Sequence, residues 1–331
     1  MAGQPSIAAG VSVRNPVIEG LRAASVLYIV AFWHLLDYVP ALSAWHNAVT
    51  LRITVVVLGL FVFLSGYLAG GHALAPGIGG LTDFYVRKFL RIYPLYLLAL
   101  FLFSQFALAD GETLLRAASL ASMFQGPAPP TLWFVSMLLL LYLVAPLLMA
   151  LAQSASGFWM VTTALSVGLA AAGLLLERFD DRLAIYFPAF ALGVYVAIAR
   201  WRPGAIARIL AAAFLPVAWV VSLAGGTAAE SSLFSIPLAM AGPVAIWVVL
   251  AESEFPANRI VTAIGYASYS MYLLHRPIYV LLSDFLAPAA GLERAVAFGV
   301  AGIPLVAGLA WGLQKSYDSL LARFRHAMPQ R

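Results

Sequence analysis

The chain has 331 residues, of which 63% are hydrophobic and only 10% are charged, and its mean hydropathy is +0.93. Because a soluble domain carries about 25% charged residues, this composition excludes a soluble protein and predicts a polytopic membrane protein. The net charge of +5 does not indicate a nucleic-acid partner, since basic residues in such proteins mark cytoplasmic loops. The chain has no cysteine, which excludes disulfides, thiolate metal sites and a cysteine nucleophile.

Apolar stretches of helical length recur along the chain and predict an all-α fold of about ten transmembrane helices. Residues 1–16 are expected to form a cytoplasmic N-terminal tail, residues 17–314 the transmembrane domain, and residues 315–331 a basic cytoplasmic tail with the character of an interfacial helix. The predicted spans are 17–39, 51–71, 91–109, 131–152, 158–176, 184–199, 206–224, 232–251, 263–286 and 295–314.

Lysine and arginine are distributed unevenly between the predicted loops. If the N-terminus is cytoplasmic, 13 of the 19 lie in cytoplasmic segments, 5 lie in outer segments, and Arg276 lies inside a span. A surplus of basic residues marks the cytoplasmic side of a membrane protein. We therefore expect both termini in the cytoplasm, which agrees with an even number of spans.

The first apolar stretch, 17–39, carries more charge than a membrane anchor needs. Glu19 and Arg22 lie near its start, and His34 and Asp37 lie toward its end. A charge at mid-membrane costs about 2.5–3.5 kcal/mol, so this helix is expected to face a polar cavity. His34 is the group best suited to proton transfer near neutral pH. The alternative is a histidine that only hydrogen-bonds within the helix bundle.

Basic residues also gather where the third span begins. Arg87 and Arg91 are four residues apart and share a helix face, with Lys88 beside them. Arginine suits phosphate recognition, so the cluster favours a platform for a cytosolic anionic donor, with a positive-inside anchor as the alternative. In the second span, Ser65 and Gly66 indicate either close helix packing or a gap through which a narrow ligand chain passes.

Two later spans carry further candidates. Trp133 suits an interfacial position. His275 and Arg276 lie mid-span, directly before Pro277, which weakens the helix. The Arg276 guanidinium is always protonated and needs an anionic or carbonyl partner. A structural ion pair and a substrate contact would both meet that need.

Five stretches together resemble the acyltransferase-3 family, integral-membrane acyltransferases that modify bacterial polysaccharides and other glycans. The first, IEGLRAASVLYIVAFWH at 18–34, is similar to the family's first helix, with its arginine and its essential histidine. The others are similar to family motifs and follow in the family's order: FLSGYL, FYVRKFLRIYP, LWFVSMLLLLYLVAPLL and SYSMYLLHRPIYVLL. The resemblance covers about the first 150 residues and again residues 265–282.

The resemblance implies transfer of an acyl group, usually acetyl from acetyl-CoA, to a hydroxyl of a glycan or similar acceptor at a bacterial cytoplasmic (inner) membrane. It implies His34 as the catalytic histidine, acting as general base or transient acyl carrier, with Arg22 as its partner in the motif. Expected partners are acyl-CoA, the acceptor and the lipid bilayer, with no nucleic acid and no metal. The expected donor-side residues are Arg87, Lys88, Arg91, Ser65 and Gly66, and the expected acceptor or oxyanion residues are His275, Arg276, Trp133, Asp37 and Glu19.

The chain departs from the family pattern in two places. Arg22 and His34 are twelve residues apart, about 120° around a regular helix, whereas the family spacing places the pair about 20° apart. Either a one-residue π-bulge restores the common face, or the two residues do not act together. Many bacterial members also have acidic residues where this chain has Met137 and Leu138. If a carboxylate orients the histidine, Asp37 and Glu19 are the nearest in sequence.

Two other functions fit the same composition. A glycan or small-molecule transporter would also place charges and broken helices at the membrane midplane. The sequence shows no pair of inverted interrupted helices, which counts against a transporter. A non-catalytic assembly subunit is the third reading.

Overall fold

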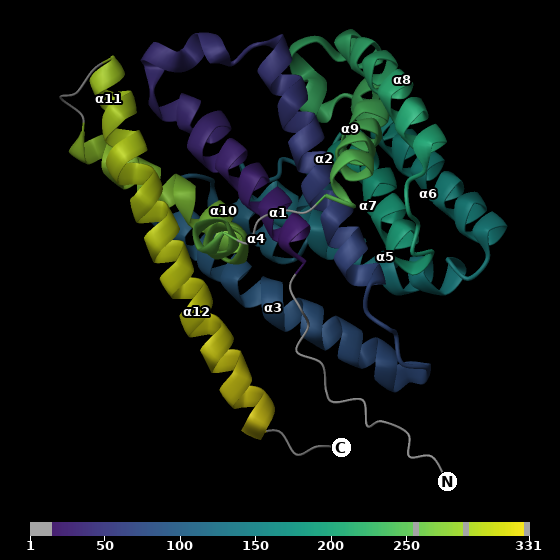
Figure 1. Ribbon diagram of the computed structural model, residues 1–331. Helices are drawn as coiled ribbons and strands as arrows, with labels where there is room; N and C mark the ends of the chain where they lie inside the picture. Colours follow the sequence, from purple (N-terminus) through teal and green to yellow (C-terminus); the bar gives the residue numbers. More distant parts are fainter. Residues whose placement is uncertain (1–14, 254–257, 287–290, 328–331) are drawn as a thin grey trace.

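A computed structural model describes residues 15–253, 258–286 and 291–327, and all regular structure in these ranges is helical, as predicted (Figure 1). The helices are α1 (Pro16–Tyr28), α2 (Ala48–Gly70), α3 (Gly77–Gln105), α4 (Gly111–Ala118), α5 (Trp133–Leu151), α6 (Ala155–Leu175), α7 (Arg182–Ile198), α8 (Ala205–Ser222), α9 (Ile236–Leu250), α10 (Arg259–Phe285), α11 (Leu292–Ala297) and α12 (Ile303–Ala327). Shorter π or 3-10 helices are η1 (Ile29–Trp33), η2 (His34–Tyr38), η3 (Pro40–Trp45), η4 (Ala121–Met123), η5 (Leu223–Ser231), η6 (Leu233–Ser235) and η7 (Phe298–Gly302).

Seven helical segments in the described ranges are long and apolar enough to cross a membrane. They coincide with seven of the ten predicted spans, and the other three predicted spans correspond to α3, α7 and α10. Helix α7 has only 17 residues, while α3 and α10 carry Arg91 and Arg276 among their apolar residues. The chain is therefore an all-helical integral membrane protein with seven candidate spans, and the count of ten stays a prediction.

Three asparagines fix where α1, α2 and α10 begin. The side chain of Asn15 accepts a hydrogen bond from the Val17 amide, and that of Asn258 accepts from the Ile260 amide. Asn47 forms a capping box with Thr50 at the start of α2. Such caps satisfy backbone N–H groups that have no partner inside the helix. The three helices that surround the candidate site thus have starts encoded locally in the sequence.

The helices divide into a packed centre and an exposed edge. Helix α1 packs against α10, and α2 packs against α7 and α9. Helices α6 and α8 lie at one edge and α12 at the other, and α6 and α8 leave most of their surface exposed (Figure 1). Their exposed side chains are largely apolar, as expected for helices that face lipid.

The start of α1 and the end of α12 lie toward the same side of the bundle (Figure 1). This arrangement agrees with the prediction that both ends of the chain face one compartment, and the assignment of that side to the cytoplasm stays a prediction. Helix α12 runs without a break from Ile303 to Ala327. The predicted boundary between the membrane domain and a separate tail, at residue 314, therefore falls inside a helix. The predicted N-terminal tail lies almost entirely outside the described residues.

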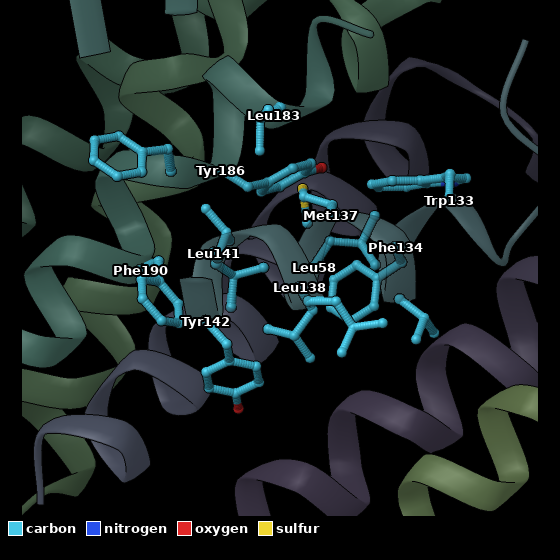
Figure 2. Close-up of a cluster of buried hydrophobic side chains, with 14 of the residues drawn as sticks. Leu58, Trp133, Phe134, Met137, Leu138, Leu141, Tyr142, Leu183, Tyr186 and Phe190 are labelled. Atoms are coloured by element: carbon cyan, nitrogen blue, oxygen red, sulfur yellow. The ribbon is translucent and has the colours of Figure 1, made fainter. Parts of the chain in front are cut away.

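The centre of the bundle is a cluster of apolar and aromatic side chains from α2, α5 and α7 (Figure 2). Met137 is fully buried and Leu138 is 8% exposed, and both lie among other apolar side chains in this cluster. An ionised carboxylate in place of Met137 would be buried among these apolar side chains, which carries a desolvation cost. The apolar surroundings thus agree with the apolar residues that this chain has where many family members have acidic ones.

Helices α2 and α7 approach each other through glycines. A Cβ atom on Gly66 would lie 2.1 Å from the backbone oxygen of Phe190, and one on Gly193 would lie 2.1 Å from the backbone oxygen of Phe63. Small residues at helix interfaces permit this close approach in membranes. Of the two roles considered for Gly66, the structure supports close helix packing.

We expect Gly66→Ala to destabilise the protein by about 2–3 kcal/mol, because the added methyl group must push α2 away from α7. The matched control is Gly168→Ala on α6, where a Cβ atom would meet nothing within 4 Å. That control should be neutral or slightly stabilising, since alanine is the better helix former. Thermal unfolding of the purified variants in detergent measures both. Equal unfolding temperatures for the two variants would contradict the packing role.

Candidate functional site

The helix that carries Arg22 and His34 is regular only as far as Tyr28. It continues as the π-helical turn η1 over Ile29–Trp33, and the hydroxyl of Tyr279 on α10 donates to the carbonyl of Val30 within it, at 3.0 Å. A π turn accommodates one extra residue. The π turn therefore takes up one of the twelve residue steps from Arg22 to His34. The remaining eleven steps of regular helix place the two residues about 20° apart around the axis.

Arg22 and His34 accordingly face the same neighbour, helix α10. Nη2 of Arg22 donates to Oγ of Ser268 at 2.9 Å, and Nδ1 of His34 lies 2.9 Å from Nε2 of His275. Ser268 and His275 are seven residues apart, about two turns, and so share one face of α10. Of the two alternatives, the structure contains the π-bulge that restores a common face.

The two histidines form a directed hydrogen-bonded pair. Nδ1 of His275 lies 2.8 Å from the carbonyl oxygen of Tyr272. A carbonyl only accepts, so this nitrogen carries the hydrogen. With both rings neutral, Nε2 of His275 then accepts from Nδ1–H of His34, and Nε2 of His34 keeps its lone pair. The ring planes differ by only 8° and their centroids are 4.8 Å apart.

A cavity of about 180 Å³ lies between α1, α2, α3, α5 and α10. One end is lined by His72, Lys88 and Arg91, and the other by Phe134 and Tyr272. Along α2 its lining runs from His72 to Phe61, a depth of about 16 Å at the rise of a helix. The ring of Tyr272 is also a neighbour of His34, with centroids 6.4 Å apart. The cavity thus ends one aromatic ring away from His34.

The described lining of this cavity contains cations and no acidic side chain. Arg22, Lys88 and Arg91 all line it, as does Ser65. Nζ of Lys88 lies 4.7 Å above the centre of the Tyr142 ring. Lys88 precedes the predicted span, and its burial, with a smaller contribution from nearby arginines, lowers its pKa from 10.5 to about 8. The mouth is therefore suited to an anionic ligand.

Two residues predicted for the donor side lie elsewhere. Gly66 packs against α7, and Arg87 is exposed; neither is among the residues that line the cavity. Arg22 is in the cavity wall, about three helical turns before His34. Its ion pair with Glu19, at 3.7 Å, lies near the start of α1. Glu19 is therefore remote from the other residues predicted for the acceptor or oxyanion side.

Comparison with known sequences decides the family. The sequence model of a family described as "Acyltransferase domain", acyltransferase-3, matches residues 15–314. The chain belongs to the acyltransferase-3 family. No curated protein and no solved structure matches the chain significantly. The family match covers most of the chain, including all residues of the histidine pair and the cavity, and it confirms the resemblance found in the five motifs.

In this acyltransferase the nearest carboxylates in sequence do not orient the histidine. Oδ2 of Asp37 accepts from Nη2 of Arg276 at 2.9 Å, and Oδ1 lies 3.6 Å from Nε2 of His46. Arg276 also donates from Nε to the hydroxyl of Thr131. Among the described residues, the partner of His34 is His275 and not an acid. The anionic partner that Arg276 required is Asp37.

Beside this ion pair lie Trp133, which the sequence predicted for the site, and other residues that the motifs did not single out. Trp133 is buried, with the guanidinium of Arg182 4.1 Å from its ring centre and the Tyr186 ring 6.1 Å away. Glu230 lies close enough to Arg182, Asp37 and Arg276 to interact electrostatically. Its Oε1 atom and the hydroxyl of Tyr186 are buried without a hydrogen-bond partner in the described structure. Buried polar atoms of this kind are suited to hydrogen-bonding a ligand.

We expect Asp37 and Arg276 to show a coupling of about 1 kcal/mol in a double-mutant cycle, the value typical of a partly exposed ion pair. Asp37→Asn and Arg276→Gln should each lower the free energy of unfolding, and the double variant should lose less than their sum. Thermal unfolding in detergent provides the three differences. Strict additivity would show that the pair does not stabilise the fold, and would favour Arg276 as a substrate contact.

Proposed function

We propose that this acyltransferase moves an acyl group, by default acetyl, from cytosolic acyl-CoA to a hydroxyl of a glycan or similar acceptor. The observation that carries the proposal is the histidine pair. His34 presents an unprotonated Nε2, fixed by His275, beside the inner end of a cavity lined by cations. A neutral imidazole held in one tautomer is equipped to remove a proton from an attacking hydroxyl.

The cavity supports acyl-CoA as the donor. CoA combines several phosphates with a long, thin chain that ends in the thioester. Lys88 and Arg91 at the mouth offer positive charge to phosphates, and the narrow space beyond them, lined largely by apolar and aromatic side chains, suits the chain. Arg22 and Ser65 supply polar groups along its wall. The thioester would then approach His34 from the side of Tyr272.

The chemistry balances with the residues present. Nε2 of His34 takes the proton of the acceptor hydroxyl as its oxygen attacks the thioester carbonyl. The carbon–sulfur bond breaks, and the CoA thiolate leaves and takes up the proton from the imidazolium. Alternatively, Nε2 attacks the thioester first and expels the CoA thiolate; the acceptor hydroxyl then displaces the imidazole from the acyl group, and its proton ends on the thiolate. In either route Arg276, next to His275 in sequence, would favour developing negative charge on the carbonyl oxygen.

The acceptor would approach from the side that carries the Asp37–Arg276 ion pair. Trp133, Tyr186 and Glu230 lie on that side, and the last two present unsatisfied buried oxygens. These groups are suited to the several hydroxyls of a sugar. The donor and acceptor would then meet at His34 from opposite faces, which fits a glycan acceptor outside a bacterial inner membrane and a donor in the cytoplasm.

We expect His34→Ala to reduce acyl transfer at least about 100-fold while CoA binding is retained, because general-base catalysis contributes that much or more. Purified protein with acetyl-CoA and a cell-envelope glycan extract is assayed for release of free CoA thiol. Wild-type protein that binds CoA but releases none with any extract would contradict the proposed reaction. Substrate flux without CoA consumption would instead indicate a transporter.

In the same assay, His275→Gln and His275→Leu separate positioning from packing. Glutamine can place an acceptor oxygen near the position of Nε2, whereas leucine fills the space without one. We expect the glutamine variant to retain more activity, and the leucine variant to lose activity and shift its pH profile because the tautomer of His34 is no longer fixed. Equal losses in both variants, with unchanged pH profiles, would remove the positioning role.

The affinity for CoA should depend on pH through Lys88. With a pKa of about 8, its ammonium is charged below that pH and becomes neutral above it, so CoA should bind roughly tenfold more weakly at about pH 9 than at about pH 7. Phosphate monoesters stay fully ionised over this range. Calorimetric titration measures the step, which Lys88→Gln should abolish. Arg87→Gln, outside the cavity lining, should preserve it. A step that persists in Lys88→Gln would exclude Lys88 as its origin.

A further inference from the structure

Two adjacent hollows lie on the face of α2 opposite the cavity that is lined by Lys88 and Arg91. One, of about 240 Å³, is an apolar slot between α6, α7 and α9, lined by residues such as Trp159, Leu192 and Val244. The other, of about 510 Å³, is polar and is lined by Arg200 and Arg202 among others. Val196, Trp201 and Trp247 line both hollows. The two hollows therefore adjoin each other, one of them apolar and the other basic.

The basic part lies where the chain enters a candidate membrane span. Arg200 and Arg202 are in the connection between α7 and α8, and the next candidate span begins at Ala205. The turn is held by a hydrogen bond from the Trp201 amide to the carbonyl of Val196, at 3.1 Å. Tryptophan and arginine at such a position are typical of the membrane–water interface. The slot extends from there along the apolar helices.

The charge of the polar hollow is unbalanced. Neither the Arg200 nor the Arg202 guanidinium makes a hydrogen bond or ion pair with a residue in the described ranges, and both residues are exposed. The acidic residue in the lining, Glu252, is already paired with Arg208 at 2.9 Å. Two positive charges are thus left to attract an anion.

The second observation comes from Trp247, which lines both hollows. Its side chain is 5% exposed, and its indole Nε1–H is buried with no hydrogen-bond partner in the described structure. A buried donor without an acceptor destabilises the fold. An acceptor oxygen of a bound molecule, placed between the basic hollow and the apolar slot, would satisfy it.

We propose that the two hollows bind one anionic glycerophospholipid. Arg200 and Arg202 would face its phosphate, the Trp247 indole would donate to a phosphate or glycerol-ester oxygen, and an acyl chain would lie in the slot. Basic pockets between membrane helices are known to suit anionic headgroups. A small free anion would leave the slot empty, and a neutral lipid would leave the two arginines unpaired. The site is separate from the histidine pair and from the cavity assigned to the donor.

The test is native mass spectrometry of the full chain in detergent, titrated with dioleoyl phosphatidylglycerol or dioleoyl phosphatidylcholine. Wild-type protein should retain the anionic lipid preferentially. Arg200→Gln/Arg202→Gln should weaken its binding roughly tenfold or more, since each juxtamembrane basic residue contributes about fivefold. Trp247→Phe should weaken it without changing charge. Val244→Trp, which fills the slot, should weaken it while leaving both arginines in place.

The matched control is Arg259→Gln/Arg323→Gln, which removes the same charge from exposed positions on α10 and α12. It should bind phosphatidylglycerol as the wild type does, and CoA binding should be unchanged in every variant that unfolds at the wild-type temperature. Equal retention of the two lipids, or an equal loss in the control, would overturn the proposal. If soluble glycerol 3-phosphate displaced the lipid and Val244→Trp did not change this displacement, the site would be reassigned to a free phosphate ester.

Discussion

The candidate site depends on one contact between two helices, the hydrogen bond from His34 to His275. For His34 to face α10, the first helix must absorb an extra residue, and the π turn η1 does so between Tyr28 and His34. Helix α10 supports this geometry. Tyr279 donates to the carbonyl of Val30 in the turn, and Ser268 accepts a hydrogen bond from Arg22, about two turns earlier on α1. A buried imidazole with a single partner keeps one tautomer, which is what a proton acceptor requires.

The two sides of the His34–His275 contact differ in how their charges are arranged. The cavity on one side is lined by Arg22, Lys88 and Arg91, without an acidic side chain among its described residues. On the other side, charges occur as pairs, such as Arg276 with Asp37 and Arg182 with Asp180. A cavity wall with this surplus of positive charge favours an anionic ligand, whereas paired charges cost less to bury and leave hydrogen-bonding capacity for neutral groups. The two sides are thus suited to chemically different substrates.

Several features of the fold were predictable from local patterns. Apolar runs of helical length predicted the helices, and the structure shows that asparagines before α1, α2 and α10 fix their starts locally. The limits of local patterns are equally clear. Arg52 lies at the start of a predicted span, where nothing in the sequence indicates its partner, yet it is 1% exposed and donates to the carbonyl of Ser222 at the end of α8. No pattern within α2 contains the end of α8.

The sequence by itself determined the membrane class, the helical fold, the family, and the histidine and arginines on which the site is built, because hydropathy and motif spacing are properties of single segments. Only the tertiary structure decided which residues meet. It gave His34 a histidine and not a carboxylate, assigned Asp37 to Arg276, moved Gly66 from the ligand cavity to a helix interface, and brought Glu230 and Trp247 forward as unsatisfied buried groups. These outcomes depend on which faces of distant helices pack together, and a one-residue change in helical register alters every one of them.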